Sequence, residues 1–496
     1  MMDELEKSDL FILAAKRANK RGRPRAESVE RRKRAEGNTS EQRTHRTLSR
    51  ASVSQRLERV RARARHGKKE RFTALMHHIT LDILDAAFGW LKRDAAAGVD
   101  GVTWDEYAHN REGNLIQLHA RLHRGVYRAM PVRRKYIPKP DGRQRPLGIA
   151  ALEDKIVQRA LVEVLNAIYE QDFLGFSYGF RPGRGQHDAL DALAVGIDCA
   201  KVNWIVDADI ARFFDAVSHE WLLRFVELRI GDPRVVRLIR KWLKAGVSED
   251  GVQLPTETGT PQGAVISPLL ANIYLHYVFD LWAQRWRKHA TGRVIIVRYA
   301  DDIVVGFSHE AEARRFVTEL RERLEKFALT LHPDKTRVLE FGRFAAKNRA
   351  MQGLCKPETF DFLGFTHIAG IDGRGIFQLQ RKTRRDRLRA ALRTIKESLL
   401  KRRHDPIAAQ GEWLGRVVRG YFAYHAVPTN FRSLDAFRHY VLNLWRRALN
   451  RRSHKDRTTW DRIARIAAQW LPRPRILHPW PSVRFLVNHP RWEPGA

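Results

Sequence analysis

Cysteine is scarce in this sequence, since Cys199 and Cys355 are the only two among 496 residues. Two cysteines so far apart cannot supply a disulfide framework or the CxxC pairs of a structural zinc site. The low cysteine content therefore excludes small disulfide-stabilised folds and suits a reducing compartment.

Long hydrophobic runs are also lacking, because no segment approaches the roughly 18 apolar residues of a membrane-spanning helix. The apolar run from Leu10 to Ala15 follows an acidic start and is too short for a secretory signal peptide. We therefore expect no association with a membrane and a cytoplasmic location.

Acidic residues are few relative to basic ones, with 56 Asp and Glu against 91 Lys and Arg and a net charge of +35. Such an excess destabilises a compact protein through self-repulsion unless a polyanion neutralises it. We expect nucleic acid to be that polyanion, with an affinity that falls steeply with salt. An anionic membrane surface is the rival interpretation, but no long amphipathic or lipidation signal supports it. The expected state is a nucleoid-associated ribonucleoprotein.

Composition divides the chain into four parts. Residues 1–70 are rich in Arg, Ser and Thr, and we interpret them as a disordered or partly helical basic arm; a merely solubilising tail is the alternative. Helix-like and strand-like patterns mix over residues 71–375, which predicts an α+β region. Residues 376–450 have the apolar spacing of amphipathic helices with basic polar faces. Residues 451–496 form a basic tail rich in Pro and Trp, a candidate DNA-binding region.

Two adjacent aspartates, Asp301 and Asp302, interrupt the β-rich segment from Val297 to Val305. We expect them at the tip of a hairpin. Asp is a poor strand residue and adjacent carboxylates repel each other, so divalent cations would stabilise the pair. Mg²⁺ prefers oxygen ligands from one or two carboxylates plus substrate phosphate. Taken alone, the dipeptide is more simply an inert, solvated turn.

A second acidic strand favours a metal site over an inert turn. Asp207 and Asp209 lie two residues apart after Trp204, on one face of the expected strand. Carboxylates from two strands can hold two metal ions about 3.5–4 Å apart, as polymerases require. Asp215 follows shortly afterwards, and we expect it to cap the helix that begins near Ser218.

Eight short motifs follow one another along the chain. They are Gly98–Val102, Ile137–Pro140 with Arg145–Ile149, Tyr178–Arg184, Asp209–Asp215, Gly259–Gly263 with Ser267–Asn272, Tyr299–Asp302, Leu331–Thr336 and Phe362–Phe365. In this order and spacing they resemble group II intron-encoded reverse transcriptases of the bacterial type. The resemblance runs from about residue 50 to the C-terminus.

The resemblance implies an α+β right-hand polymerase fold, with fingers and palm, followed by an α-helical thumb or maturase domain. It implies an RNA-directed DNA polymerase that also assists the splicing and mobility of its intron. The implied partners are group II intron RNA as template, a DNA primer or target, and deoxynucleoside triphosphates. The implied cofactor is a pair of Mg²⁺ ions, for which Mn²⁺ can substitute. The oligomeric state stays open, a dimer included.

The resemblance also assigns roles to single residues. The catalytic and metal-binding set is Asp209, Asp301, Asp302 and the main-chain carbonyl of Ile210, with Asp207 left a structural role. The nucleotide-binding set is Lys139, Arg145, Phe214, Gln262 and Lys335. The RNA-binding set is Arg181, Arg184, Arg416, Arg419 and Tyr421. The simpler readings are core packing for Phe214, generic RNA contact for Lys139 and Arg145, and a solvated basic face for the helical region.

One further expectation concerns a missing domain, and two alternative functions stay open. Many family members end in a zinc-supported HNH nuclease with cysteine pairs, and the two isolated cysteines predict that this domain is lacking. A domesticated or defence-associated reverse transcriptase is one alternative, which the maturase-like helical region disfavours. A splicing cofactor without polymerase activity is another, which the intact acidic and nucleotide-binding residues disfavour.

Overall fold

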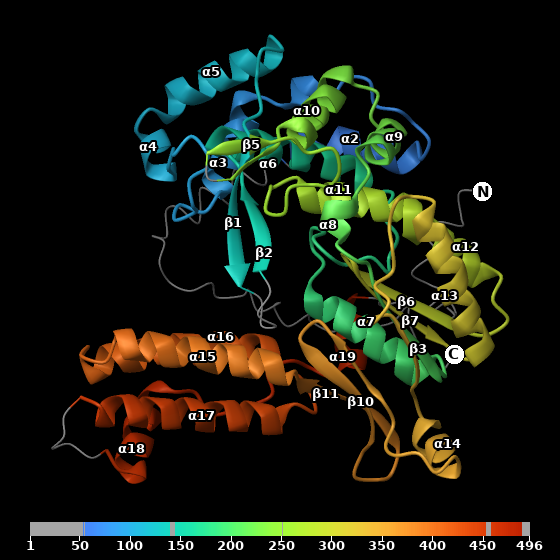
Figure 1. Cartoon of the computed structure of the whole chain (residues 1–496), viewed down its shortest axis with the longest axis vertical. Helices are drawn as coiled ribbons and strands as arrows, with labels where there is room; N and C mark the ends of the chain where they lie inside the picture. Colours follow the sequence, from blue (N-terminus) through green and yellow to red (C-terminus); the bar gives the residue numbers. More distant parts are fainter. Residues whose placement is uncertain (1–52, 54, 139–143, 250, 453–457, 489–496) are drawn as a thin grey trace, which may run out of the picture.

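The computed structural model describes residues 53, 55–138, 144–249, 251–452 and 458–488, which fold into helices and three small sheets (Figure 1). This is the α+β class predicted from the sequence. None of the helices in these ranges is long and apolar enough to cross a membrane.

The N-terminal part is mainly helical and carries one β-hairpin. Its elements are α2 Glu58–His66, η3 Met76–His78, α3 Leu81–Trp90, α4 Trp104–His109, α5 Arg111–His123, β1 Val132–Pro138, β2 Gln144–Ile149 and α6 Leu152–Tyr169. The apolar residues from Leu152 to Tyr169 recur at helical spacing, which predicts a helix with the bounds of α6, and most residues of this helix are buried. Helices α2 and α3 both pack against it.

The expected basic arm, residues 1–70, is described only from residue 53 onward. Its last part forms α2, in which Val60 and Ala64 are buried in the same core as α6. The folded body therefore begins before Arg71, where the sequence predicts its start. The reason is a narrow apolar stripe, Leu57, Val60 and Ala64, which the surrounding arginines obscure.

The middle part contains a four-stranded antiparallel sheet in the order β6-β7-β3-β8. Its elements are α7 Gln186–Cys199, β3 Trp204–Asp209, α8 Phe213–Ala216, α9 His219–Glu227, α10 Pro233–Lys244, β4 Val247–Glu249, β5 Val252–Leu254, α11 Ser267–Leu275, η4 His276–Asp280, α12 Leu281–Lys288, β6 Val294–Tyr299, β7 Asp302–Phe307, α13 Glu310–Glu325, β8 Arg337–Glu340 and α14 Ala345–Met351. β1 joins β2 on one side and β4 on the other, and β5 pairs with β4.

The two faces of this sheet belong to different cores. Ile205 and Val304 pack with residues of α7, whereas Val206 and Ile303 pack with residues of α12 and α13. Because side chains alternate along a strand, the position of Asp209 falls on the α7 side, in line with Ile205. The sheet thus presents its acidic residues at one end of one face.

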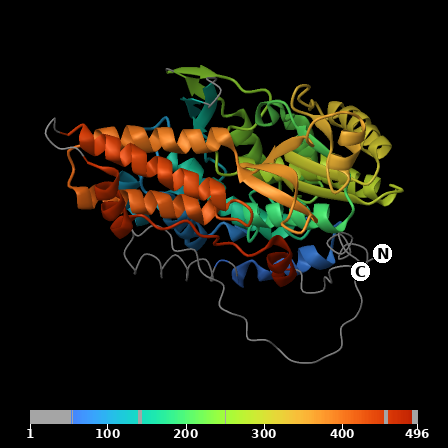
Figure 2. The same cartoon turned by 90° about the horizontal axis from the view of Figure 1, so that it is seen from below.

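The C-terminal part joins a three-stranded sheet to a helical bundle, which lies beside the rest of the molecule (Figures 1 and 2). Its elements are β9 Thr359–Phe362, β10 Phe365–Ile371, β11 Phe377–Thr383, α15 Arg385–Lys401, α16 Ile407–His425, α17 Phe431–Asn450, α18 Trp460–Trp470 and α19 Pro481–Asn488. Helices α15 to α18 enclose their own core around Leu414 and Trp445. The helices begin at Arg385, later than residue 376, because β11 occupies residues 377–383.

Candidate active site

The adjacent aspartates lie at a hairpin tip, as predicted. β6 and β7 pair antiparallel with Tyr299 opposite Asp302, which leaves Ala300 and Asp301 as a two-residue loop. Ala300 has a φ of 57°, a left-handed conformation that such short loops commonly require at this position. The loop therefore places Asp301 at the turn and Asp302 at the first position of β7.

The second acidic strand lies directly beside this hairpin. β3 pairs antiparallel with β7, and the register sets Asp209 opposite Asp302. Opposed residues on neighbouring strands direct their side chains to the same face. Carboxylates that are 92 residues apart or more in the sequence thus meet at one end of the sheet.

Burial and repulsion among these carboxylates raise the pKa values of Asp301 and Asp302. Loss of hydration and the neighbouring charges of Asp301 and Asp209 raise the pKa of Asp302 to about 7, although its side chain keeps an exposed face. Loss of hydration and the charge of Asp209 likewise raise the pKa of Asp301. Such a cluster favours either a proton or a bound cation.

A cation already stands in this cluster, because the ammonium of Lys335 forms an ion pair with the carboxylate of Asp209. The possible metal ligands at this end of the sheet are the carboxylates of Asp209, Asp301 and Asp302, and carboxylate oxygens suit a hard divalent ion such as Mg²⁺. Ile210 follows Asp209 and bridges to Leu331, so its backbone lies at the same end of β3. Within the described ranges, no three His, Cys, Asp or Glu side chains are by themselves arranged as a metal site. A metal held by these carboxylates would need further oxygen ligands, such as those of a substrate phosphate.

Asp207 and Asp209 both lie on β3, but their carboxylates have different partners. Its carboxylate accepts from Arg337 Nη2 at 3.2 Å, and loss of hydration raises its pKa to about 6 despite that partner. Arg337 is the residue opposite Asp207 on β8. Asp207 is thereby tied to the neighbouring strand, as a structural role requires.

Two of the expected nucleotide-binding residues, Arg145 and Gln262, contact each other, and Arg145 is close enough to Asp301 for its charge to lower the pKa of that carboxyl against the effect of burial. Arg145 Nε donates to Gln262 Oε1 at 2.9 Å, and Gln262 Nε2 donates to Asp215 Oδ1 at 3.3 Å. Phe214 is half-buried, and its carbonyl accepts from Thr260 N at 2.7 Å. Lys139 lies outside the described residues.

Asp215 does not cap α9, which corrects the expectation from the sequence. The side chain of Ser218 itself accepts from Trp221 N and caps that helix, while Asp215 lies inside the short helix α8. The carboxylate of Asp215 instead holds Gln262, a contact between residues 47 apart that local patterns could not reveal.

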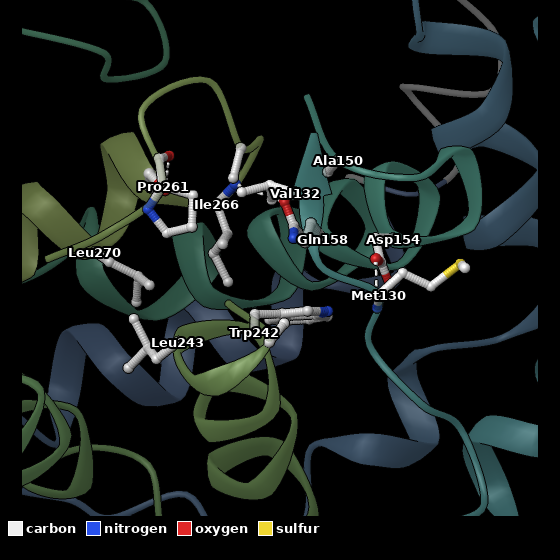
Figure 3. A pocket seen from close by; sticks show the side chains of 13 residues that line it. Met130, Val132, Ala150, Asp154, Gln158, Trp242, Leu243, Pro261, Ile266 and Leu270 are labelled. Carbon is white, nitrogen blue, oxygen red and sulfur yellow. Dashed lines mark hydrogen bonds between the residues drawn. The ribbon is translucent and has the colours of Figure 1, made fainter. Parts of the chain in front are cut away.

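A small cavity of about 10 Å³ is lined in part by Pro261 and Ile266, which belong to the loop that also carries Gln262 (Figure 3). Gln158 Oε1 accepts from Val265 N at 2.9 Å, which fixes the loop from inside. The volume is at the lower limit for a single water molecule, so the cavity is too small for a ligand. Asp154 lines it as well, and burial raises its pKa to about 6.

Arg181 is placed differently from the prediction. Its side chain is 3% exposed, pairs with Glu170 at 3.0 Å and donates to the carbonyls of Leu174 and Ser177. A guanidinium so enclosed cannot contact RNA, and its role is to fix the fold around the segment that follows α6. Arg184 donates to the carbonyl of Gly175 and is half-buried.

The predicted RNA-binding residues of the helical bundle divide into two kinds. Arg416 and Arg419 are exposed on α16. Tyr421 stacks on Phe437 with ring centroids 3.6 Å apart, so its ring contributes to the bundle core. Leu414 and Phe422 are buried in the same core, as their spacing predicts.

Comparison with known proteins matches the middle of the chain to a described protein family. A family model described as reverse transcriptase (RNA-dependent DNA polymerase) matches residues 137–367. That range includes Asp209, Asp301 and Asp302 together with Arg145 and Gln262.

Three relatives illustrate the similarity. Protein YkfC of Escherichia coli (strain K12) is 39% identical over 274 residues, which are 49% of this chain and 71% of that protein. Group II intron-encoded protein LtrA of Lactococcus lactis subsp. cremoris is 38% identical over 225 residues, 44% of this chain and 37% of that protein. Nuclear intron maturase 2, mitochondrial, of Arabidopsis thaliana is 24% identical over 271 residues, 45% of this chain and 35% of that protein.

Proposed function

The chain belongs to the family of group II intron reverse transcriptases and maturases, and we propose that it copies an RNA template into DNA at the site formed by Asp209, Asp301 and Asp302. The observation that carries this proposal is the strand register, which sets Asp209 opposite Asp302 and beside Asp301. The substrates are a primed RNA template and deoxynucleoside triphosphates.

The metal-holding residues are the three carboxylates and the main-chain carbonyl of Ile210. Two Mg²⁺ ions, or Mn²⁺ in their place, supply Lewis-acid stabilisation of the primer hydroxyl and of the leaving pyrophosphate when bound. Loss of hydration and the charge of Asp209 raise the carboxyl pKa values of Asp301 and Asp302, and a cation offsets the clustered negative charge. Lys335 neutralises Asp209 until substrate arrives.

The residues on the other side of the site orient the incoming nucleotide. Arg145 carries a fixed positive charge suited to triphosphate oxygens. Gln262 is held by hydrogen bonds to Arg145 and Asp215. We propose that its amide forms hydrogen bonds at the nascent base pair. Phe214 is proposed to supply the bulky ring that would clash with a ribose 2′-hydroxyl and so select deoxynucleotides. Lys139 is proposed as a second phosphate contact.

The parts of the fold take the roles of a right hand. In this proposal the β6-β7-β3-β8 sheet with its helices is the palm, and the N-terminal helices with β1 and β2 are the fingers. The bundle α15–α18 is the thumb or maturase domain, and residues 451–496 contact DNA. Residues 1–70 contribute basic charge toward the intron RNA.

The polymerase proposal is tested by extending a DNA primer on an RNA template with the purified chain. We expect template-length DNA that depends on Mg²⁺, disappears with a chelator and does not form when the primer is omitted. Binding of the primed template should persist in the chelator, because basic residues dominate the affinity. Tight binding with no extension in Mg²⁺ or Mn²⁺ would contradict the proposal and favour a splicing cofactor without polymerase activity.

A second proposed function is assistance to splicing of the intron RNA. It is supported by the separate core of α15–α18 and by the exposed Arg416 and Arg419 on its surface. Folding of a large RNA is opposed by phosphate repulsion, which a protein of net charge +35 can offset at low Mg²⁺. The test is the splicing rate of the cognate intron at low Mg²⁺ with and without the protein. An unchanged rate at saturating protein would contradict this function.

A further inference from the structure

Arg298, three residues before Asp301, forms a fully buried ion pair with Asp280 of η4. Both side chains are 0% exposed, and Arg298 Nε and Nη2 donate to the two carboxylate oxygens at 2.7 Å each. Burial disfavours the charged carboxylate, yet the adjacent guanidinium keeps the pKa of Asp280 below its usual value. A buried pair of this kind is a weak source of stability, because both ions lose their hydration. Its location therefore suggests a positional role.

The remaining donors of Arg298 reach the turn and the segment behind it. Nη1 donates to the carbonyl of Ala300 and to Asn272 Oδ1, both at 3.0 Å, and Nη2 donates to Ser177 Oγ at 2.7 Å. An arginine side chain has five N–H groups, and here five hydrogen bonds use them. Asn272 and Ser177 are themselves buried.

A second connection supports the same turn from behind. Asn272 Nδ2 donates to the carbonyl of Gly179 at 2.7 Å. Gly179 lies so close to the turn that an added Cβ would meet the backbone nitrogen of Ala300 and stand 2.9 Å from the carbonyl carbon of Tyr299. Asn272 therefore links Arg298 to the backbone against which the turn rests.

The turn needs such support because Ala300 is in the left-handed region, with a φ of 57°. A Cβ crowds the backbone in this conformation, and glycine is the usual occupant. The hydrogen bond from Arg298 to the Ala300 carbonyl fixes the peptide that leads into Asp301. A loop that relaxed would turn the two carboxylates away from Asp209.

We propose that Arg298 is a positioning residue which, together with Asn272, holds Ala300 in its left-handed conformation and so aims Asp301 and Asp302 at the metal. The proposal rests on the proposed role of these aspartates as metal ligands. Outer groups that orient ligands commonly alter metal affinity by 10-fold to 100-fold.

The test compares Arg298→Lys with Arg229→Lys in the full chain. Arg229 forms a second enclosed pair, with Asp172 at 2.8 Å and side-chain exposures of 3% and 9%, but it binds backbone near α2 rather than the turn. Binding of Mn²⁺ to the protein without nucleic acid is measured by electron paramagnetic resonance, beside thermal unfolding and the Mg²⁺ dependence of primer extension. Asp301→Asn identifies which part of the Mn²⁺ binding belongs to the turn.

We expect both lysine variants to unfold at lower temperature. Arg298→Lys should weaken Mn²⁺ binding and raise the half-saturating Mg²⁺ concentration by about tenfold or more, whereas Arg229→Lys should leave both within about twofold of wild type. If Arg298→Lys does not fold, Asn272→Ala keeps the Arg298–Asp280 pair and should shift metal binding in the same direction.

Equal Mn²⁺ affinities of the Arg298→Lys and Arg229→Lys proteins would overturn the proposal, as would a turn that binds no Mn²⁺ in the wild type. Failure of the proposed polymerase function is a separate outcome. It would appear as normal Mn²⁺ binding with no primer extension, and the comparison of affinities would still decide the role of Arg298.

Discussion

Asp209 and Asp302 lie opposite each other on the antiparallel strands β3 and β7, and their side chains emerge on the same face of the sheet. Asp301 lies in the adjoining loop, and loss of hydration together with the charges of Asp301 and Asp209 raises the pKa of Asp302 to about 7. Lys335 is the cation that pairs with Asp209. A metal that binds Asp209 must therefore displace this ammonium.

Replacing Lys335 with methionine is expected to have opposite effects on two measurements. Mn²⁺ binding without nucleic acid should tighten by up to about fivefold, since a partly exposed ion pair contributes at most about 1 kcal/mol. Primer extension should slow, because Lys335 belongs to the expected nucleotide-binding set. Lys396→Met, on the exposed face of α15, removes the same charge far from the site and serves as control. Weaker metal binding in Lys335→Met would contradict the competition between this lysine and the metal.

Phe214→Val is expected to relax the choice of sugar. Removing the ring removes the clash with a 2′-hydroxyl, so the preference for deoxynucleotides should fall by about a hundredfold. Phe213→Leu is the matched control, because Phe213 is buried beside Phe214 with ring centroids 5.3 Å apart. Incorporation of ribonucleotides and deoxynucleotides is measured in competition. If Phe214→Val discriminates as well as the wild type, the ring is core packing only.

Gly179→Ala should disturb the catalytic turn and leave the affinity for the RNA template unchanged. The new Cβ would meet the backbone of Tyr299 and Ala300, and a displacement of about 1 Å can lower a rate by about a hundredfold. Gly89→Ala in α3 has open space around the new atom and should support extension at the wild-type rate. Template affinity and extension rate are measured for both proteins. A Gly179→Ala enzyme of normal rate would show that the turn tolerates movement.

The sequence predicts those parts of the structure that depend on local patterns. The bounds of α6 and the Asp301–Asp302 hairpin follow from periodicity and from two β-rich runs around a polar pair. The contact of Asp215 with Gln262 could not be predicted in this way, because it joins the short helix α8 to a loop 47 residues further on, which only the tertiary fold brings close. The burial of Arg181 could not be predicted either, because Glu170 and the carbonyls of Leu174 and Ser177 meet around its guanidinium only in the folded chain.

Splicing and polymerisation are expected to depend on different surfaces. Arg416→Gln with Arg419→Gln should slow protein-assisted splicing at low Mg²⁺ and reduce the salt dependence of intron binding by roughly one unit per lost phosphate contact. Arg314→Gln with Arg321→Gln removes the same charge from exposed positions of α13 and is the control. Equal effects of the two pairs would mean that total charge alone sets RNA affinity.

The central claim is that Asp209, Asp301 and Asp302, and not Asp207, carry the polymerase chemistry. The most direct measurement is the single-turnover rate of deoxynucleotide addition on a primed RNA template by the four single Asp→Asn variants, with template binding checked for each. We predict that Asp209→Asn, Asp301→Asn and Asp302→Asn lose at least about a thousandfold, while Asp207→Asn, whose partner is Arg337, stays within about tenfold of wild type. A near-normal rate in any of the first three variants, or an equal loss in Asp207→Asn, would contradict the account.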